Sequence, residues 1–182
     1  MNTNKSEYRT KSYDIHKVLC KEGSKLMMRI GHGFDSHAYV TDHERPLVLG
    51  GVIFESDFAL QGHSDSDVII HACIDSLLSP AGFGDIGTLF PDSDSKYLNA
   101  NSLELLQHSV ELVKSEGWTI VNIDCSVVAD NPKIQPKRLL RETKISEIIE
   151  APVTLKGKTP EGFMNFNGIA CFAVCLLSKL ND

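Results

Sequence analysis

The spacing of hydrophobic and polar positions along the chain alternates between strand-like and helix-like patterns. Residues 28–33 predict a short strand that runs into a glycine-flanked turn. Residues 46–54 predict a hairpin with Gly50-Gly51 at its turn. A helix is then predicted to open at residues 62–65, with Ser64 as its N-cap. Its inner face follows from the helical spacing of Val68, Ile69, Ala72, Cys73, Ser76 and Leu77.

The second half of the chain continues the mixed order. A long loop, a helix, a strand, a helix and two further strands are predicted in turn, at residues 80–94, 102–116, 118–129, 135–150, 153–158 and 168–179. Strands and helices interleave without an internal repeat. This order favours a single α+β domain with a mixed sheet and helices on one face of it.

Composition and charge narrow the function classes. The chain has 182 residues, of which 42% are hydrophobic, and a net charge of −6. An acidic chain without a basic stripe is a poor candidate for binding nucleic acid. No apolar stretch approaches the roughly 20 residues that a membrane span needs. Residues 1–27 are polar and are predicted to form a flexible extension, so the folded domain is placed at residues 28–182.

The five cysteines argue against two further classes. Their number is odd and none of them forms a C-x-x-C pair. A disulfide scaffold and a thiolate zinc site are therefore disfavoured, and the prediction is buried, reduced thiols.

One candidate metal site combines two segments. Asp35 and His37 are two residues apart, so an extended backbone points both side chains to the same side. His71 follows Asp67 by one helical turn. Two histidines and one carboxylate are the ligand count of a catalytic zinc site with an open fourth position. The spacing does not establish that the three converge, because a lone helical histidine is more often a core or surface group.

Three further segments carry groups suited to a phosphate or nucleotide ligand. Residues 82–94 combine glycines, which let backbone amides approach a ligand, with a cluster of acids. Residues 129–135 place proline and lysine at a helix start. Residues 156–163 hold two lysines, a threonine and a glutamate. An acidic turn, a plain N-cap and a polar turn are the alternative interpretations, and no G-x-G-x-x-G dinucleotide motif is present.

Taken together, these segments closely resemble the 2-C-methyl-D-erythritol 2,4-cyclodiphosphate synthase family. The matching stretches are RIGHGFDSHAY, GHSDSDVIIHACIDSLL, GFGDIGTLFPDSD, ADNPKI and GIAC. The resemblance implies a homotrimer of α+β subunits around a central axis, with active sites between subunits. It implies that the 2-phosphate of 4-diphosphocytidyl-2-C-methyl-D-erythritol 2-phosphate attacks the β-phosphorus, and that CMP leaves.

The resemblance also implies residue roles. One zinc ion per subunit would lie on Asp35, His37 and His71, and a magnesium or manganese ion would bind with help from Glu161. His63 and Thr159 would stabilise the transition state. Substrate binding would involve Asp35, Ser36, His37, His63, Ser64, Asp85, Ile86, Gly87, Phe90, Asp92, Asp94, Ala129, Lys133, Ile134, Gln135, Lys158, Thr159 and Phe163.

The chain departs from the family pattern in three places. Lys158-Thr159-Pro160 replaces the usual Thr-Thr run before Glu161, and the segment after Glu161 is short. The family arginine that reaches the central cavity has no counterpart before Gly168, so we expect no strong isoprenyl diphosphate binding there. A zinc-dependent phosphohydrolase and a non-catalytic trimeric isoprenoid-binding protein are the alternative functions. The expected compartment is the cytoplasm of a bacterium or the plastid stroma of a plastid-bearing organism.

Overall fold

The computed structural model describes residues 25–42, 45–162 and 167–181. Five strands form one mixed sheet in the order β4-β1-β7-β5-β6, and β2 and β3 form a separate hairpin. The strand bounds are β1 Lys25–Val40, β2 Leu47–Leu49, β3 Val52–Phe54, β4 Ala59–Leu60, β5 Thr119–Ala129, β6 Val153–Lys158 and β7 Gly168–Asn181. The helix bounds are α2 Val68–Ala81, α3 Ile86–Leu89, η1 Ser95–Tyr97, α4 Ser102–Ser115, η2 Gln135–Lys137 and α5 Arg138–Ile149.

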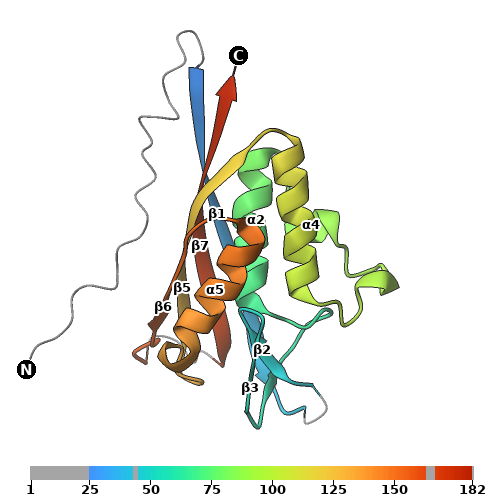
Figure 1. Cartoon of the computed structure of the whole chain (residues 1–182). Coiled ribbons are helices and arrows are strands. Elements are labelled where there is room, and N and C mark those ends of the chain that lie inside the picture. Colours follow the sequence, from blue (N-terminus) through green and yellow to red (C-terminus); the bar gives the residue numbers. More distant parts are fainter. Residues whose placement is uncertain (1–24, 43–44, 163–166, 182) are drawn as a thin grey trace, which may run out of the picture.

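Strand β1 is much longer than the sequence pattern predicts. It pairs antiparallel with β7 from Lys25↔Asn181 to Ala38↔Gly168, and the two strands run side by side through the middle of the sheet (Figure 1). The predicted glycine-flanked turn is therefore wrong, because Gly31 and Gly33 continue the strand. Their small size serves the packing of the helix layer instead. The strand also takes in residues 25–27, which were predicted to belong to the N-terminal extension.

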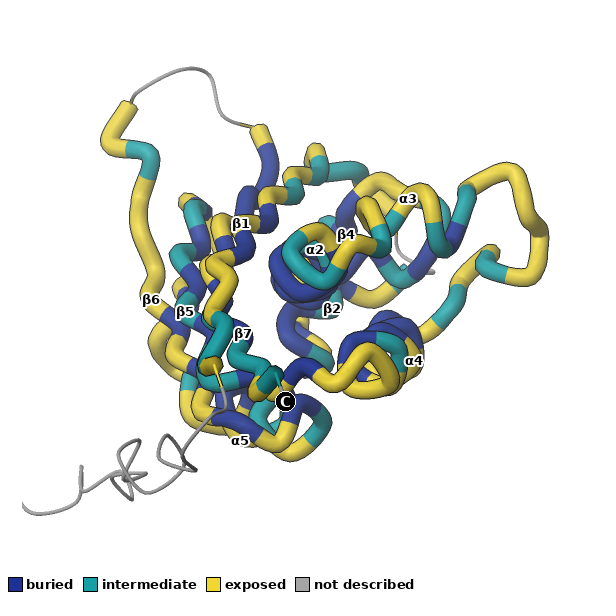
Figure 2. Tube along the Cα trace, turned by 90° about the horizontal axis from the view of Figure 1, so that it is seen from above, coloured by how far each residue is buried: buried dark blue, intermediate teal, exposed yellow. Residues whose placement is uncertain are grey.

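Helix α2 packs directly against β1 and β7, and α4 and α5 complete the layer on the same side of the sheet (Figure 2). The two glycines of β1 permit this close approach. A Cβ atom on Gly31 would lie 1.8 Å from the Ser76 carbonyl oxygen, and one on Gly33 would lie 1.9 Å from the Ala72 carbonyl oxygen. No other residue type fits there, so the prediction of helices on one face is confirmed and has a local cause.

Helix α2 begins at Val68, three residues later than predicted. Its N-cap is Asp67, whose carboxylate accepts hydrogen bonds from Ile69 N and Ile70 N, so the prediction of Ser64 as the N-cap is wrong. The same carboxylate accepts from Gly50 N at 2.8 Å and from Gly51 N at 2.6 Å. Asp67 therefore ties the turn of the β2–β3 hairpin to the start of α2.

The predicted loop over residues 80–94 is shorter in the structure. Helix α2 continues through Pro80 to Ala81 and ends at Gly82, which takes the left-handed conformation. The four-residue helix α3 follows within the same stretch. The helices predicted at 102–116 and 135–150 and the later strands agree with the structure to within a few residues.

The two faces of the sheet differ in character. The core lies between the sheet and the helices, and the opposite face leaves apolar side chains exposed along the two central strands. These are Met28, Ile30, Phe34, Phe172, Val174 and Leu180. Next to them, β5 and β6 carry an ion pair between Asp124 and Lys156. None of the helices in the described ranges is long and apolar enough to cross a membrane.

Candidate active site

Three side chains predicted as metal ligands converge on one point. Asp35 and His37 project from the helix-facing side of β1, and His71 projects from the first turn of α2. Asp35 Oδ2 lies 3.0 Å from His37 Nε2 and 3.0 Å from His71 Nδ1. The two histidine nitrogens are 3.4 Å apart. The prediction that these three residues meet is confirmed by the geometry.

These separations fit a divalent metal ion. Ligand atoms about 2.05 Å from a tetrahedral centre are about 3.3 Å from one another. The three atom pairs of this group, at 3.0, 3.0 and 3.4 Å, match that edge length. Two imidazole nitrogens and one carboxylate oxygen are donors that zinc and similar ions accept, and three protein ligands leave a coordination position open. We call Asp35, His37 and His71 the metal triad.

Electrostatics favour charge within the metal triad. Burial raises the pKa of Asp35, but hydrogen bonds and positive charge from His37 and His71 outweigh burial and hold that pKa below its usual range. Burial lowers the pKa of His71, but its hydrogen bond and attraction to Asp35 outweigh burial and raise it above its ordinary value. The group therefore keeps an ionised carboxylate ready for a cation.

The far side of the His71 ring is enclosed by hydroxyl groups. Its Nε2 lies 2.9 Å from Ser102 Oγ and 3.1 Å from Ser64 Oγ. Ser102 is the first residue of α4 and is fully buried. The pattern of the sequence indicated Ser102 only as the start of a predicted helix, because 31 residues separate it from His71. The carboxylate of Asp65 accepts a hydrogen bond from the backbone N–H of Ser102.

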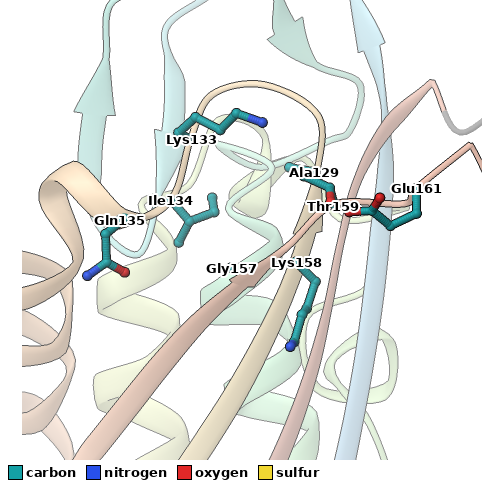
Figure 3. Close-up of a pocket in the computed structure, with 8 residues that line it drawn as sticks. All are labelled: Ala129, Lys133, Ile134, Gln135, Gly157, Lys158, Thr159 and Glu161. Carbon is teal, nitrogen blue, oxygen red and sulfur yellow. Dashed lines mark hydrogen bonds between the residues drawn. The ribbon is translucent and has the colours of Figure 1, made fainter.

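A second group of predicted residues lines a pocket of about 450 Å³. It includes the segment after β5 and the end of β6, and Figure 3 shows Thr159 and Glu161 close together at one side of it and Gln135 at the other. The hydroxyl of Thr159 donates to the carboxylate of Glu161. The described lining residues include none of the metal triad; they are Ala129, Lys133, Ile134, Gln135, Gly157, Lys158, Thr159 and Glu161.

The strand directions explain why these segments meet. Strands β5 and β6 are parallel, with Val128 opposite Lys158, so both end at the same edge of the sheet. Gly157 leaves room for Ile134, because a Cβ atom on this glycine would lie 2.9 Å from Ile134 Cβ. The buried guanidinium of Arg141 donates to the Ile134 carbonyl and so fixes the segment after β5 on its side facing the core. The pocket thus presents cations, an amide, a hydroxyl and a carboxylate to one ligand.

The metal triad and the pocket occupy the same end of the sheet. His37 pairs with Ile169 on β7, which pairs with Ala129 on β5. Strand spacings of about 4.8 Å place β1 roughly 14 Å from β6. Within one chain, β7 and β5 therefore lie between the metal triad and Glu161.

The remaining predicted residues fall into three places. Ser36 alternates with the metal ligands and is exposed, and His63 is half-buried in the segment before α2. Asp85 caps α3 and accepts from Thr88 N at 2.7 Å. Along α3 and the loop after it lie the others, namely Ile86, Gly87, the buried Phe90, and the exposed Asp92 and Asp94. Phe163 lies outside the described residues.

Comparison with known proteins places these features in a family. The sequence model of the YgbB family matches residues 28–178. The chain belongs to the YgbB family. A relative from Aquifex aeolicus, 2-C-methyl-D-erythritol 2,4-cyclodiphosphate synthase, is 42% identical over an alignment of 158 residues that covers 85% of this chain and 100% of the relative.

Two solved structures match this chain over most of its length. A 2C-methyl-D-erythritol-2,4-cyclodiphosphate synthase in a form bound to CDP matches with a TM-score of 0.75 at 36% identity, over 82% of this chain and 99% of that one. IspF from Plasmodium falciparum in complex with CDP matches with a TM-score of 0.70 at 37% identity, over 82% of this chain and 95% of that one. The α+β fold expected from the sequence is thereby confirmed.

Proposed function

We propose that this protein is a 2-C-methyl-D-erythritol 2,4-cyclodiphosphate synthase. Its substrate would be 4-diphosphocytidyl-2-C-methyl-D-erythritol 2-phosphate, and its products the cyclic diphosphate and CMP. The observation that carries the proposal is the converged metal triad in a chain that covers the full length of a relative bearing this name. The pocket at the ends of β5 and β6 supports the nucleotide part.

The reaction is an internal phosphoryl transfer. An oxygen of the 2-phosphate forms a bond to the β-phosphorus, the bond from that phosphorus to the bridging oxygen breaks, and CMP leaves with the electron pair. Such transfers depend on positioning and charge neutralisation more than on covalent catalysis. Zinc at the metal triad, with magnesium or manganese near Glu161, would supply positive charge to the phosphate oxygens. This explains how a chain of net charge −6 binds a polyanion.

The chain's own residues would hold the substrate in place. Lys133 and Gln135 offer a cation and an amide to the nucleotide, and the closeness of Ile134 to Gly157 gives the pocket an apolar wall. Thr159 offers a hydroxyl beside Glu161 at the mouth toward the diphosphate. His63, half-buried before α2, would stabilise charge on the transferred phosphate.

The erythritol part of the substrate would lie along α3 and the loop after it. Ser64 and Ser36 would contact its phosphate end. Asp85, Ile86, Gly87, Phe90, Asp92 and Asp94 would surround its hydroxyls.

We infer that the working form is a homotrimer around a central axis. The exposed apolar strip on β1 and β7 supports this inference, because a monomer would leave Ile30 at 77% and Phe34 at 46% exposure. The separation of roughly 14 Å between the metal triad and the end of β6 supports a shared site. One subunit's pocket would then face a neighbouring subunit's metal triad.

The test is an end-point assay read by phosphorus NMR. Zinc-loaded wild type with magnesium should convert the substrate to cyclic diphosphate and CMP. His71→Ala should lose both zinc and turnover, whereas Gln107→Ala, on the exposed side of α4, should retain both. Inorganic phosphate as the product would identify a hydrolase instead. A folded, zinc-loaded wild type without any turnover would refute the synthase assignment.

A further inference from the structure

We propose that Ser102 and Asp65 form a positioning relay that orients the His71 ring for its metal ion. The relay runs from the Asp65 carboxylate through the Ser102 hydroxyl to His71 Nε2, while His71 Nδ1 faces Asp35 and His37. The inference rests on the metal triad of the proposed function. It adds two residues that do not bind the metal themselves but hold one of its ligands in place.

The hydrogen bonds leave one consistent assignment of protons. The Ser102 hydroxyl donates to Asp65 Oδ1, and Ser102 N donates to Asp65 Oδ2 at 2.9 Å. An ionised carboxylate only accepts, so the single hydroxyl proton of Ser102 is committed to Asp65. Ser102 Oγ can then only accept from His71 Nε2, 2.9 Å away. The Nε2 proton is thereby fixed, and the lone pair for a metal belongs to Nδ1.

Ser64 cannot impose this orientation alone. Its Oγ lies 3.1 Å from His71 Nε2 and accepts from Ser66 N at 3.3 Å. Its own proton is free to point toward or away from the ring, so Ser64 suits either state of Nε2. Ser102 is the hydroxyl whose direction is set by a carboxylate, which makes it the deciding contact.

The relay is also well anchored. Ser102 is 0% exposed and His71 is 7% exposed, so water does not compete for these contacts. The backbone of Asp65 is fixed next to the start of α4, because its N–H donates to Ala100 O at 3.1 Å. The relay therefore links the start of α4 to a metal ligand on α2. Outer contacts of this kind orient a ligating imidazole and raise its basicity.

The test measures zinc binding directly, without turnover. Zinc affinity is obtained by competition with a chromophoric chelator for wild type, Ser102→Ala and Asp65→Asn. Ser109→Ala is the matched control, since Ser109 is an equally buried serine of α4 whose hydroxyl donates to Leu105 O instead. The zinc dissociation constant should rise roughly 10- to 100-fold in the two relay variants. The control should bind like wild type.

A second readout follows the relayed proton itself. In the zinc-loaded protein, proton NMR should show a slowly exchanging His71 Nε2–H signal for wild type and Ser109→Ala. In Ser102→Ala, the His71 Nε2–H proton should lose its protection from exchange with water. Wild-type zinc affinity together with a protected signal in Ser102→Ala would overturn the relay while leaving the synthase proposal intact. Failure of wild type to bind zinc would instead overturn the metal triad and the relay together.

Discussion

Replacing Gly33 with alanine should distort the metal triad by forcing α2 away from β1. A Cβ atom at this position would lie 1.9 Å from the Ala72 carbonyl oxygen and 2.7 Å from Ser76 N. Real Cβ contacts are essentially never below 3.0 Å, so α2 and β1 must separate by at least 1.1 Å. Both obstructing atoms are helix backbone, which cannot rotate away as a side chain can.

The displacement is large on the scale of metal coordination. Ala72 follows His71 directly, and metal–ligand distances tolerate deviations of only about 0.2 Å. We therefore expect Gly33→Ala to weaken zinc binding at least tenfold and to lower the free energy of unfolding by about 1–3 kcal/mol. Gly87→Ala is the control, because its added Cβ would meet nothing nearer than 3.8 Å.

The assay combines chelator competition for zinc with denaturant unfolding of the metal-free protein. A Gly33→Ala protein with wild-type zinc affinity and stability would show that the close approach of α2 to β1 does not set the ligand geometry. A loss of stability alone, with zinc affinity unchanged, would refute the coordination part of the reasoning.

Three further outcomes are expected. Phe172→Asp should dissociate the proposed trimer in sedimentation, because it places a charge in the exposed apolar strip on β1 and β7, whereas Leu139→Asp, at an exposed apolar position on α5, should not. Lys133→Ala should weaken CMP binding about tenfold in calorimetry, whereas Lys137→Ala, whose ammonium donates to a carbonyl of β3, should not. The metal-free protein should lose stability as pH rises above 6.5 through the raised pKa of His71, and denaturation of His71→Gln should show a flatter profile.

Local patterns were sufficient where neighbours in sequence decide the structure. The hairpin turn at Gly50-Gly51 needs positive φ at both residues, and the structure has φ of 61° and 69° there. The inner face of α2 and the later strands also follow from spacing alone. The extent of β1 did not, because its length is set by β7, which lies more than a hundred residues away.

The N-cap of α2 was predicted wrongly for a similar reason. Ser64 and Asp67 are both good N-cap residues, and sequence preference does not choose between them. The hairpin turn decides between them, because Gly50 N and Gly51 N both donate to the carboxylate of Asp67. Ser64 is then left to face His71.

The candidate site likewise combines features that the sequence reveals with features that only the fold reveals. The chemistry of the metal triad was visible as residue types, but its convergence depends on a helix pressed against two glycines. The pocket depends on β5 and β6 being parallel, which requires α5 as the crossover and cannot be derived from either segment alone. Ser102 was visible only as the start of a helix, since its contacts with His71 and Asp65 come from residues 31 and 37 positions earlier.

The central place of β7 has a consequence for the order of events during synthesis. This strand separates β1 from β5, yet it leaves the ribosome after both of them. Until then, among the described strands, β1 can pair only with the two residues of β4, and its long edge is open to other chains. Pairings this distant in sequence form slowly. The nascent chain therefore carries Asp35 and His37 on a strand that lacks its main sheet partner, and we expect the metal triad to reach its final geometry only after β7 has paired with β1.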